Sequence, residues 1–180
     1  MIEVSIVNLD AAMAPELERI ELTCFPMANP DELLSEADIR AYAETFPEGY
    51  FVAMVDGRPV GMGAGIYLDF DFSNPQHTIA EITGEHQCGN HDPDGEWYYG
   101  TDITVLPEYR GRGIGRQLLT RLIALARNLG YHKMVLTALG YNDAGIALYT
   151  RAGFSRVGVY HEQGQLDGKW VDALIMEKIL

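Results

Sequence analysis

One stretch of the chain combines closely spaced glycines with arginines, which suits the binding of phosphate groups. It reads Tyr109-Arg110-Gly111-Arg112-Gly113-Ile114-Gly115 and lies between a predicted strand and a predicted helix. Glycine has no Cβ and can adopt a positive φ, so the backbone N–H groups of such a loop can converge on an anion at a helix N-terminus. Arg110 and Arg112 can add charge-assisted hydrogen bonds. The stretch therefore predicts a phosphate-binding loop.

Two better-known glycine loops do not fit this spacing. A P-loop requires Gly-Lys-Ser/Thr, but Gly113 and Gly115 are followed by isoleucine and arginine, so the lysine and the magnesium-binding hydroxyl are missing. A dinucleotide-binding loop requires an acidic residue about 20 positions further on, where residues 129–132 contain none. The pattern that remains is R-x-x-G-x-G, formed by Arg110, Gly113 and Gly115.

The pattern R-x-x-G-x-G resembles the acetyl-CoA loop of the GNAT N-acetyltransferase superfamily. A glycine-rich turn that binds nothing could carry the same glycines, but a second stretch favours the resemblance. Residues 142–154 read NDAGIALYTRAGF, similar to the second signature of the family, N-x-x-A-x-x-x-Y-x-x-x-G-F. The usual alanine falls at Gly145 or Ile146. With two signatures in order, the chain is identified as a member of this superfamily.

The resemblance implies an α/β (α+β) fold. Its features are a mixed central sheet of about six to seven strands, helices on both faces, and two neighbouring parallel strands that splay apart to admit the pantetheine arm. The likeness is specific from Tyr98 to Phe154 and weak from Asp69 to Glu96. We expect residues 1–180 to form a single N-acetyltransferase domain, with residues 69–96 as an irregular insert near the substrate pocket.

The hydrophobic pattern predicts the elements that would position these motifs. The predicted helices are residues 11–25, 30–45, 113–129 and a short helix from the cap residue Asn142 to Ala152. The predicted strands are residues 50–55, 59–68, 78–83, 97–106, 132–138, 154–160 and 170–180. Asp56-Gly57 predicts a hairpin between the first two strands, and residues 161–169 are expected to form a polar loop.

The resemblance also assigns residues to acetyl-CoA. It implies that backbone groups at residues 103–105 bind the pantetheine and the thioester, with the Val105 N–H as oxyanion donor, and that the amides of residues 110–115 hold the pyrophosphate. Asn142 would contact the pantetheine arm, a role compatible with a plain N-cap. The residues implied to bind acetyl-CoA are Ile103, Thr104, Val105, Arg110, Gly111, Arg112, Gly113, Ile114, Gly115 and Asn142.

Tyr149 matches the position that in many relatives donates a proton to the coenzyme A thiolate. A phenol can do this because its pKa of about 10 lies above that of a thiol. A tyrosine on a helix that faces a sheet can instead serve packing alone. Tyr149 is therefore expected to act as the catalytic acid, with packing as the alternative.

Asp102 is the candidate base, because an amine with a pKa of about 10 must lose a proton before it attacks. It is the only carboxylate inside the strand before the glycine loop. Alternation places Asp102 and Thr104 on one face and Tyr99, Thr101 and Ile103 on the other, unless a bulge intervenes. A structural role for Asp102 is the alternative. Further candidates for the base are Glu81, Glu85, His86, His91 and Glu96.

Composition limits the partners. The net charge is −13, from 26 acidic and 13 basic residues, so neither nucleic acid nor a membrane surface is expected to bind. No apolar run reaches about 18 residues and no signal peptide is evident, which predicts a cytoplasmic protein. Cys24 and Cys88 have neither CxxC nor zinc-site spacing, so no metal is expected. Arginines gather in residues 110–127, while residues 56–100 contain only Arg58, which suits a polyanionic cofactor at one end and a cationic or zwitterionic amine at the other.

These features together predict an acetyl-CoA-dependent N-acetyltransferase. It would transfer an acetyl group to the primary amine of a small molecule by direct attack in a ternary complex. One alternative is a non-catalytic acyl-CoA-binding sensor, which would not require Tyr149. Another is a protein N-terminal or lysine acetyltransferase, whose peptide groove residues 69–96 would cover. A homodimer is a further expectation from the resemblance.

Overall fold

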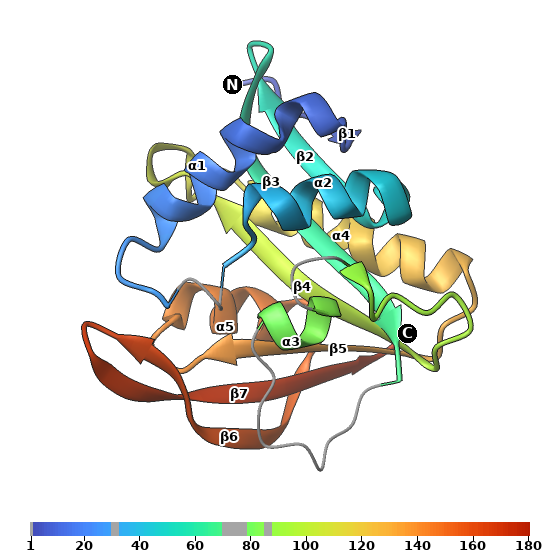
Figure 1. Cartoon of the computed structure of the whole chain (residues 1–180), viewed down its shortest axis with the longest axis vertical. Helices are drawn as coiled ribbons and strands as arrows, with labels where there is room; N and C mark the ends of the chain where they lie inside the picture. The colour runs from blue at the N-terminus through green and yellow to red at the C-terminus, as the bar shows by residue number, and fades with distance from the viewer. Residues whose placement is uncertain (1, 30–32, 70–78, 85–87) are drawn as a thin grey trace.

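The computed structural model describes residues 2–29, 33–69, 79–84 and 88–180. In this part of the chain the strands form one mixed sheet in the order β1-β2-β3-β4-β5-β7-β6 (Figure 1). Only β4 and β5 pair in parallel among the strand pairs of this sheet, within the described residues. The strands are β1 (Ser5–Asn8), β2 (Tyr50–Val55), β3 (Arg58–Leu68), β4 (Trp97–Val105), β5 (Lys133–Leu139), β6 (Ser155–Leu166) and β7 (Lys169–Ile179).

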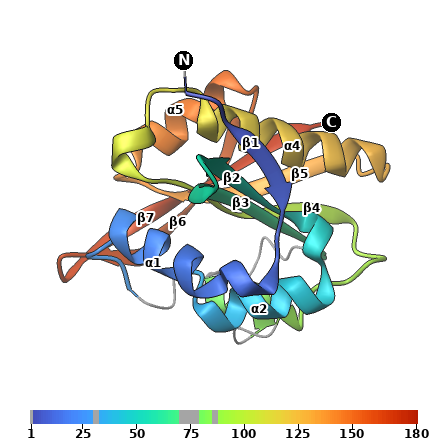
Figure 2. The ribbon, with the colours of Figure 1, turned by 90° about the horizontal axis from the view of Figure 1, so that it is seen from above.

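Helices cover both faces of the sheet (Figure 2). Helices α1 and α2 lie on one face, and α4 and α5 lie on the other. The helices are α1 (Ala14–Cys24), α2 (Glu36–Thr45), α3 (Ile79–Thr83), α4 (Ile114–Asn128) and α5 (Asp143–Arg151), with 3-10 turns at Ala11–Met13, Pro47–Gly49 and Pro107–Tyr109. The mixed sheet with helices on both faces confirms the predicted fold class.

Helix α4 sits against the sheet because its apolar side chains recur at helical spacing. Its buried residues are Ile114, Leu118, Leu119, Leu122, Ile123 and Ala126. Gly63 on β3 permits the close approach, since a Cβ there would lie 3.3 Å from Leu118 Cβ. This packing fixes the start of α4, and with it the glycine loop, at one end of β4.

Strands β4 and β5 separate part way along their length. Their ladder pairs Tyr98 with Met134, Tyr99 with Val135 and Gly100 with Leu136. Beyond these pairs β4 runs on to Val105 along β3, and β5 runs on to Leu139 along β7. The predicted splayed pair of parallel strands is therefore confirmed, and it opens after Gly100 and Leu136.

Two local expectations were wrong, and one strand was missed. The strand expected at residues 78–83 is the helix α3 in its described part, where Ile82 is buried in the core and Thr83 donates to Asp38 Oδ1 at 3.1 Å, so tertiary contacts override the β-branched composition. The polar loop expected at residues 161–169 is instead strand except for a turn at Asp167 and Gly168, because β6 and β7 extend as a largely exposed hairpin. Strand β1 was not expected; it is short and mostly exposed at the sheet edge.

Helix α2 begins later than its apolar pattern suggests. Ser35 caps it, accepting from Asp38 N–H while Asp38 accepts from Ser35 N–H, so the helix starts at Glu36 rather than at residue 30. Residues 30–32 and Thr78 lie outside the described residues. Within the described ranges, no helix is both long and apolar enough to cross a membrane.

Candidate active site

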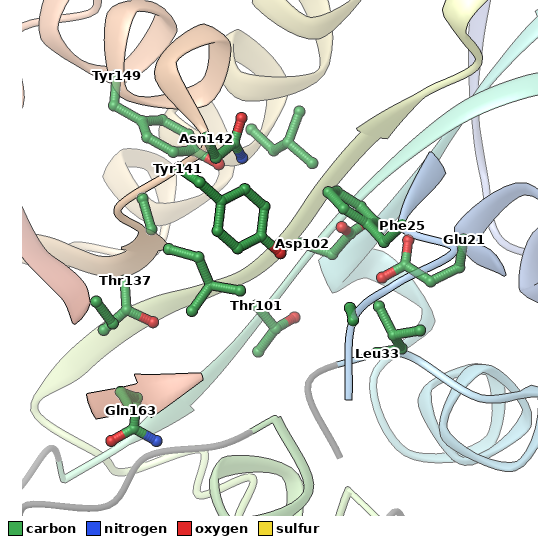
Figure 3. A pocket seen from close by; sticks show the side chains of 15 residues that line it. Glu21, Phe25, Leu33, Thr101, Asp102, Thr137, Tyr141, Asn142, Tyr149 and Gln163 are labelled. Atoms are coloured by element: carbon green, nitrogen blue, oxygen red, sulfur yellow. The ribbon is translucent and has the colours of Figure 1, made fainter. Parts of the chain in front are cut away.

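A pocket opens where β4 and β5 part (Figure 3). Its volume is about 90 Å³, and its lining comes from α1 and the segment after it, β4, β5, the loop before α5, α5, β6 and β7. Four of the residues predicted from the sequence line it together: Asp102, Ile103, Asn142 and Tyr149. The expected acid and the expected base therefore share one pocket at the open end of the parallel pair.

A bulge in β4 determines which way Asp102 faces. Ala64 on β3 pairs with Asp102 and Gly65 pairs with Gly100, which leaves Thr101 as an extra residue. The Thr101 hydroxyl lies 2.6 Å from the hydroxyl of Tyr42 on α2, so Thr101 faces the side of α1 and α2.

Asp102 faces the same side as Thr101. It accepts a hydrogen bond from Thr104, and Thr104 contacts α1. Ile103 points the other way, with its Cγ2 3.8 Å from the position of a Cβ on Gly115 of α4. The shared face of Asp102 and Thr104 was predicted correctly, but the opposite placement of Thr101 was wrong because the bulge interrupts the alternation.

Two carboxyl groups meet the hydroxyl of Thr104. Thr104 Oγ1 lies 2.7 Å from Asp102 Oδ1 and 2.8 Å from Glu21 Oε2. Glu21 is almost fully buried on α1, at 3% exposure, and the Leu34 N–H lies 3.5 Å from its Oε1. Asp102 Oδ2 is buried without a hydrogen-bond partner among the described atoms. One oxygen of the Asp102 carboxyl is therefore unpaired among the described residues.

Burial dominates the electrostatics of this pair. It raises the pKa of Asp102 from 3.8 to about 7, against the opposing effects of hydrogen bonds from Thr104 and from the Ile103 backbone. Burial, followed by the charge of Asp102, raises the pKa of Glu21 well above its ordinary value. Asp102 can therefore exchange a proton near neutral pH, as a general base requires.

Tyr149 combines packing with access to the pocket. Its ring packs against Phe154 at a centroid distance of 5.9 Å, and the side chain is 8% exposed. It lines the same pocket as Asp102 (Figure 3). Burial, followed by the charge of Asp102, raises the pKa of its phenol. The hydroxyl therefore stays protonated at neutral pH and is available as a donor.

The glycine loop has the backbone that an anion site needs. Gly111 and Gly113 adopt positive φ values of 74° and 81°, and Gly113 is the N-cap of α4 without a side-chain cap. The first helical hydrogen bond runs from Gln117 N–H to the Gly113 carbonyl at 3.1 Å. The preceding amides at the start of α4 have no partner within the helix, which makes them suitable donors to phosphate.

The two arginines of the loop are placed differently. The Arg110 Nε–H donates to the Val105 carbonyl at 2.8 Å, which ties the loop to the end of β4. Arg112 donates to the Glu108 carbonyl at 3.2 Å and lies over the ring of Tyr109, 5.7 Å from its centroid. Ile114, at the start of α4, is 1% exposed, so its side chain anchors the helix in the core.

The backbone N–H groups at the end of β4 point in alternating directions, toward β3 or toward the opening between β4 and β5. The Leu106 N–H donates to the Val60 carbonyl on β3 at 3.0 Å. Because N–H groups alternate along a strand, those of Val105 and Ile103 point away from β3 and toward the opening, whereas that of Thr104 points toward β3. The Thr104 N–H, which was expected to bind the pantetheine with those of Ile103 and Val105, thus faces β3, and the Thr104 side chain contacts Glu21 and Asp102.

Asn142 caps helix α5. Its Oδ1 accepts from Gly145 N–H at 3.0 Å, as the capping interpretation predicted. A Cβ at Gly145 would lie 2.6 Å from Asn142 Nδ2, so the glycine at this position leaves room for the Asn142 amide. Asn142 also lines the pocket, and the two roles are compatible.

The remaining base candidates lie elsewhere or outside the described residues. His91 stacks on Phe46 at 4.4 Å, and its Nδ1 lies 3.4 Å from the Tyr67 N–H, while burial lowers its pKa. Glu81 and Glu96 are not among the residues that line the pocket. Glu85 and His86 lie outside the described residues. Across the described ranges, no group of three or more His, Cys, Asp or Glu side chains is arranged to hold a metal ion.

Sequence reasoning missed Glu21, Phe25 and Tyr141. Glu21 on α1 and Phe25, directly after the end of that helix, reach the pocket from more than 75 residues before Asp102 in the chain. Tyr141 projects into it from the loop between β5 and α5 (Figure 3). A signal for Glu21 was present, since an acidic residue next to Ile20 falls on the buried side of an amphipathic helix.

The chain matches known acetyltransferases over most of its length. The model of the acetyltransferase (GNAT) family matches residues 14–154. An uncharacterized N-acetyltransferase of Bacillus subtilis, YkwB, is 35% identical over 84% of this chain and 65% of its own length. An L-methionine sulfoximine/L-methionine sulfone acetyltransferase of Pseudomonas paraeruginosa is 37% identical over 54% of this chain and 58% of its own length. The chain thus spans less than two thirds of these relatives.

Solved structures share the fold. The putative acetyltransferase YncA of Salmonella typhimurium, solved with acetyl-CoA, has a TM-score of 0.71 and 22% identity, with 98% of this chain and 94% of that chain covered. The loading GNATL domain of CurA from Lyngbya majuscula has a TM-score of 0.79 and 12% identity, with 98% of each chain covered. With the splayed strands, the glycine loop and the matched family model all in place, this chain belongs to the acetyltransferase (GNAT) family.

Proposed function

We propose that this protein is an acetyl-CoA-dependent N-acetyltransferase that acts on the primary amine of a small molecule by direct attack in a ternary complex. One observation carries the proposal: Asp102, with a pKa of about 7, and the protonated phenol of Tyr149 line one pocket where β4 and β5 separate. A base and an acid in one pocket are what acetyl transfer from a thioester to an ammonium requires.

The chain offers a fitting cradle for acetyl-CoA. The αL glycines Gly111 and Gly113 and the uncapped amides at the start of α4 would hold the pyrophosphate, with Arg110 and Arg112 beside them. The backbone of Ile103 and Val105 would bind the pantetheine and the thioester oxygen, and Asn142 would contact the arm. When bound, acetyl-CoA supplies the activated acetyl group as a thioester.

Each residue then has a defined task. Asp102 Oδ2 accepts a proton from the ammonium, which frees the nitrogen lone pair for attack. The Val105 N–H stabilises the oxygen that becomes negative in the tetrahedral intermediate. The Tyr149 hydroxyl donates a proton to the departing sulfur. Residues 69–96 are proposed to lie near the acceptor.

The two thiols support direct transfer. The Cys24 Sγ lies 3.5 Å from the Val105 carbonyl, but burial raises its pKa to about 11, so it is a poor nucleophile at neutral pH. Burial raises the pKa of Cys88 to about 12. An acetyl-cysteine intermediate would need a thiolate that neither environment provides.

The charge of the pocket favours a cationic acceptor without a carboxylate. Its lining holds the carboxyls of Glu21 and Asp102, and none of its described residues is a lysine or arginine. All 13 Lys and Arg residues of the sequence lie in the described ranges, so the remaining segments contribute none. An acceptor carboxylate next to the amine would meet like charge and no cationic side chain among these residues.

An amino-acid-like acceptor is the second candidate. It is favoured by the Pseudomonas paraeruginosa relative, whose name gives L-methionine sulfoximine and L-methionine sulfone as acceptors, and by the 36% identity over 42% of this chain to the L-amino acid N-acyltransferase MnaT of Escherichia coli. The acidic pocket opposes it. A homodimer and a cytoplasmic location stay predictions.

A matched panel tests the proposal and separates the two acceptors. Thiol release from acetyl-CoA is measured with each L-amino acid and with the amine that remains when its carboxylate is removed, for example lysine and cadaverine or phenylalanine and phenethylamine. Short peptides are included, and acetyl-CoA binding is titrated by calorimetry.

We expect kcat/KM to be at least about tenfold higher for the amines, which corresponds to about 1.4 kcal/mol of avoided like-charge contact. Preference for the amino acids would overturn the cationic-acceptor assignment. Turnover of peptides alone would identify a protein acetyltransferase. Acetyl-CoA binding without any turnover would favour the sensor.

A further inference from the structure

A single hydroxyl proton has to serve two carboxyl groups at the centre of the site. Thr104 Oγ1 lies within hydrogen-bonding distance of Asp102 Oδ1, at 2.7 Å, and of Glu21 Oε2, at 2.8 Å. A threonine hydroxyl donates one hydrogen bond and otherwise only accepts, whereas an ionised carboxylate only accepts. If both carboxyls were ionised, one short contact would join two acceptors. One of the carboxyls must therefore carry a proton and donate it to Thr104.

The surroundings indicate which carboxyl holds this proton. Glu21 is the more deeply placed, at 3% exposure, whereas Asp102 is half-buried and faces the pocket. Asp102 also accepts from the Ile103 backbone, which favours its ionised form. The only backbone donor near Glu21 among the described residues is the Leu34 N–H, at 3.5 Å. The proton is therefore better placed on Glu21.

Neighbouring titratable groups agree with this assignment. They are Cys24 on α1, Asp38 on α2, Tyr50 on β2 and Tyr149 on α5, while the β3 residues that pair with Thr104 and Asp102, Met62 and Ala64, are not titratable. The thiol and the two phenols are neutral, and the charge of Asp38 raises the pKa of Glu21 further. The nearest cation in these contacts, Arg110, interacts with Cys24 and the Val105 carbonyl.

We propose that Glu21 is a neutral carboxylic acid in the resting protein, that it donates to Thr104, and that Thr104 in turn donates to Asp102. The role of this hydrogen-bond chain in catalysis rests on the proposed function, but its presence in the resting protein does not. It directs the one hydroxyl proton of Thr104 to Asp102 Oδ1, so that Oδ2 is left as the proton acceptor in the pocket. Glu21 and Thr104 are positioning residues, and Asp102 is the catalytic residue.

The proton balance follows from this arrangement. The N–H bond of the ammonium breaks as an O–H bond forms at Asp102 Oδ2, and the Glu21/Asp102 pair changes from one negative charge to none. After the amine attacks and the C–S bond breaks, Tyr149 protonates the sulfur, and a second proton leaving the nitrogen restores the phenol. The proton held by Asp102 passes to solvent, so the pair again holds one proton.

Infrared difference spectroscopy between the wild type and its variants, recorded without any substrate, tests which carboxyl group is protonated in the resting protein. The carbonyl stretch of a protonated carboxylic acid should be present in the wild-type protein at pH 8, absent in Glu21→Gln and retained in Asp102→Asn. Absence of the band in the wild type, or its loss in Asp102→Asn rather than in Glu21→Gln, would overturn the proposal. This readout stands even if the protein acetylates nothing, so the failure of the proposed function is distinguishable.

The pH profile of kcat/KM tests whether the hydrogen-bond chain from Glu21 through Thr104 to Asp102 acts in catalysis. Thr104→Val removes the hydroxyl but keeps the branched shape, so Asp102 loses a hydrogen bond that favours its ionised form. We expect the apparent pKa to rise by about one unit, with a loss of about fivefold at pH 7 that is recovered at higher pH. Thr104→Ser, which restores the hydroxyl, is the matched control and should keep the wild-type apparent pKa.

Glu21→Gln distinguishes a neutral Glu21 from an ionised one. Glutamine is neutral and can still donate to Thr104 Oγ1, so the apparent pKa of the rate should stay near the wild-type value, whereas Glu21→Leu, which cannot donate, should raise it. A fall of about one unit in Glu21→Gln would mean that a negative charge had been removed. That fall in the apparent pKa, or a kcat/KM of Thr104→Val that is lowered equally at all pH values, would contradict the proposed hydrogen-bond chain.

Discussion

Replacing Asp102 by asparagine should stabilise the protein at alkaline pH while removing the proposed base. Burial raises the pKa of Asp102 in the folded state from 3.8 to about 7. Between these values the folded state binds a proton that the unfolded state releases, so stability falls as the pH rises from about 4 to about 7 and is level above. Asparagine has no charge to bury and escapes this loss.

The magnitude follows from the shift. A change of 3.2 pKa units, from 3.8 to about 7, corresponds to at most about 4 kcal/mol of lost stability at pH 8, at about 1.36 kcal/mol per unit. The oxygen of asparagine can still accept from Thr104, so this hydrogen bond is kept. We expect a gain of about 2 to 4 kcal/mol, which for a domain of this size raises Tm by at least about 4 °C.

The assay is thermal and urea unfolding of both proteins from pH 4 to pH 8. The stability difference should be small at pH 4 and reach its maximum above pH 7. The control is Asp172→Asn, because Asp172 is a carboxylate whose pKa is lowered by the Glu162 N–H and His161, so that variant should show no alkaline gain. If the free energy of unfolding of Asp102→Asn exceeded that of the wild type by the same amount at pH 4 and pH 8, or did not exceed it at pH 8, the reasoning would be refuted.

Three further substitutions address the cofactor loop, the acid and the thiol. Gly113→Glu forces a side chain onto a φ of 81° and puts a negative charge where the pyrophosphate is proposed, so calorimetry should detect no acetyl-CoA binding; retained affinity would contradict the loop assignment. Tyr149→Phe should lower kcat about tenfold or more while acetyl-CoA affinity is kept, and an unchanged kcat, with chemistry shown to limit the rate, would leave Tyr149 with packing alone. Cys24→Ala should keep kcat in the thiol-release assay, and its loss would favour an acetyl-cysteine route.

Local sequence signals were enough for the unit that would bind the coenzyme. The glycines of the loop predict backbone conformations that other residues rarely adopt, and Gly111 and Gly113 have positive φ values. The apolar periodicity of residues 113–129 located α4 to within one residue at each end. Asn142 was identified as a cap from its position before a helical pattern. Each of these features depends on neighbours in sequence.

The acidic side of the pocket could not be predicted from local sequence signals. Glu21 comes close to Asp102 only because α1 packs across β4, where Glu21 contacts Thr104, a residue 83 positions further along the chain. Gly100 precedes the bulge at Thr101, but a glycine inside a strand does not say which residue is the extra one, and that residue is found only from the shift in the pairing of β4 with β3. Period-two alternation fails at the one position where the facing of Asp102 had to be decided.

The site is also where the protein departs from the usual rules of a stable interior. Asp102 Oδ2 is buried without a partner, and the Thr104 hydroxyl stands between two carboxyl groups, although either feature costs stability in an ordinary core. Placing a leucine or a valine there would serve the fold better. A buried carboxyl that keeps one oxygen unpaired is useful only if a ligand donor completes it, as a substrate ammonium would. The destabilising feature and the proposed activity are therefore the same feature, and one variant, Asp102→Asn, should change both in opposite directions.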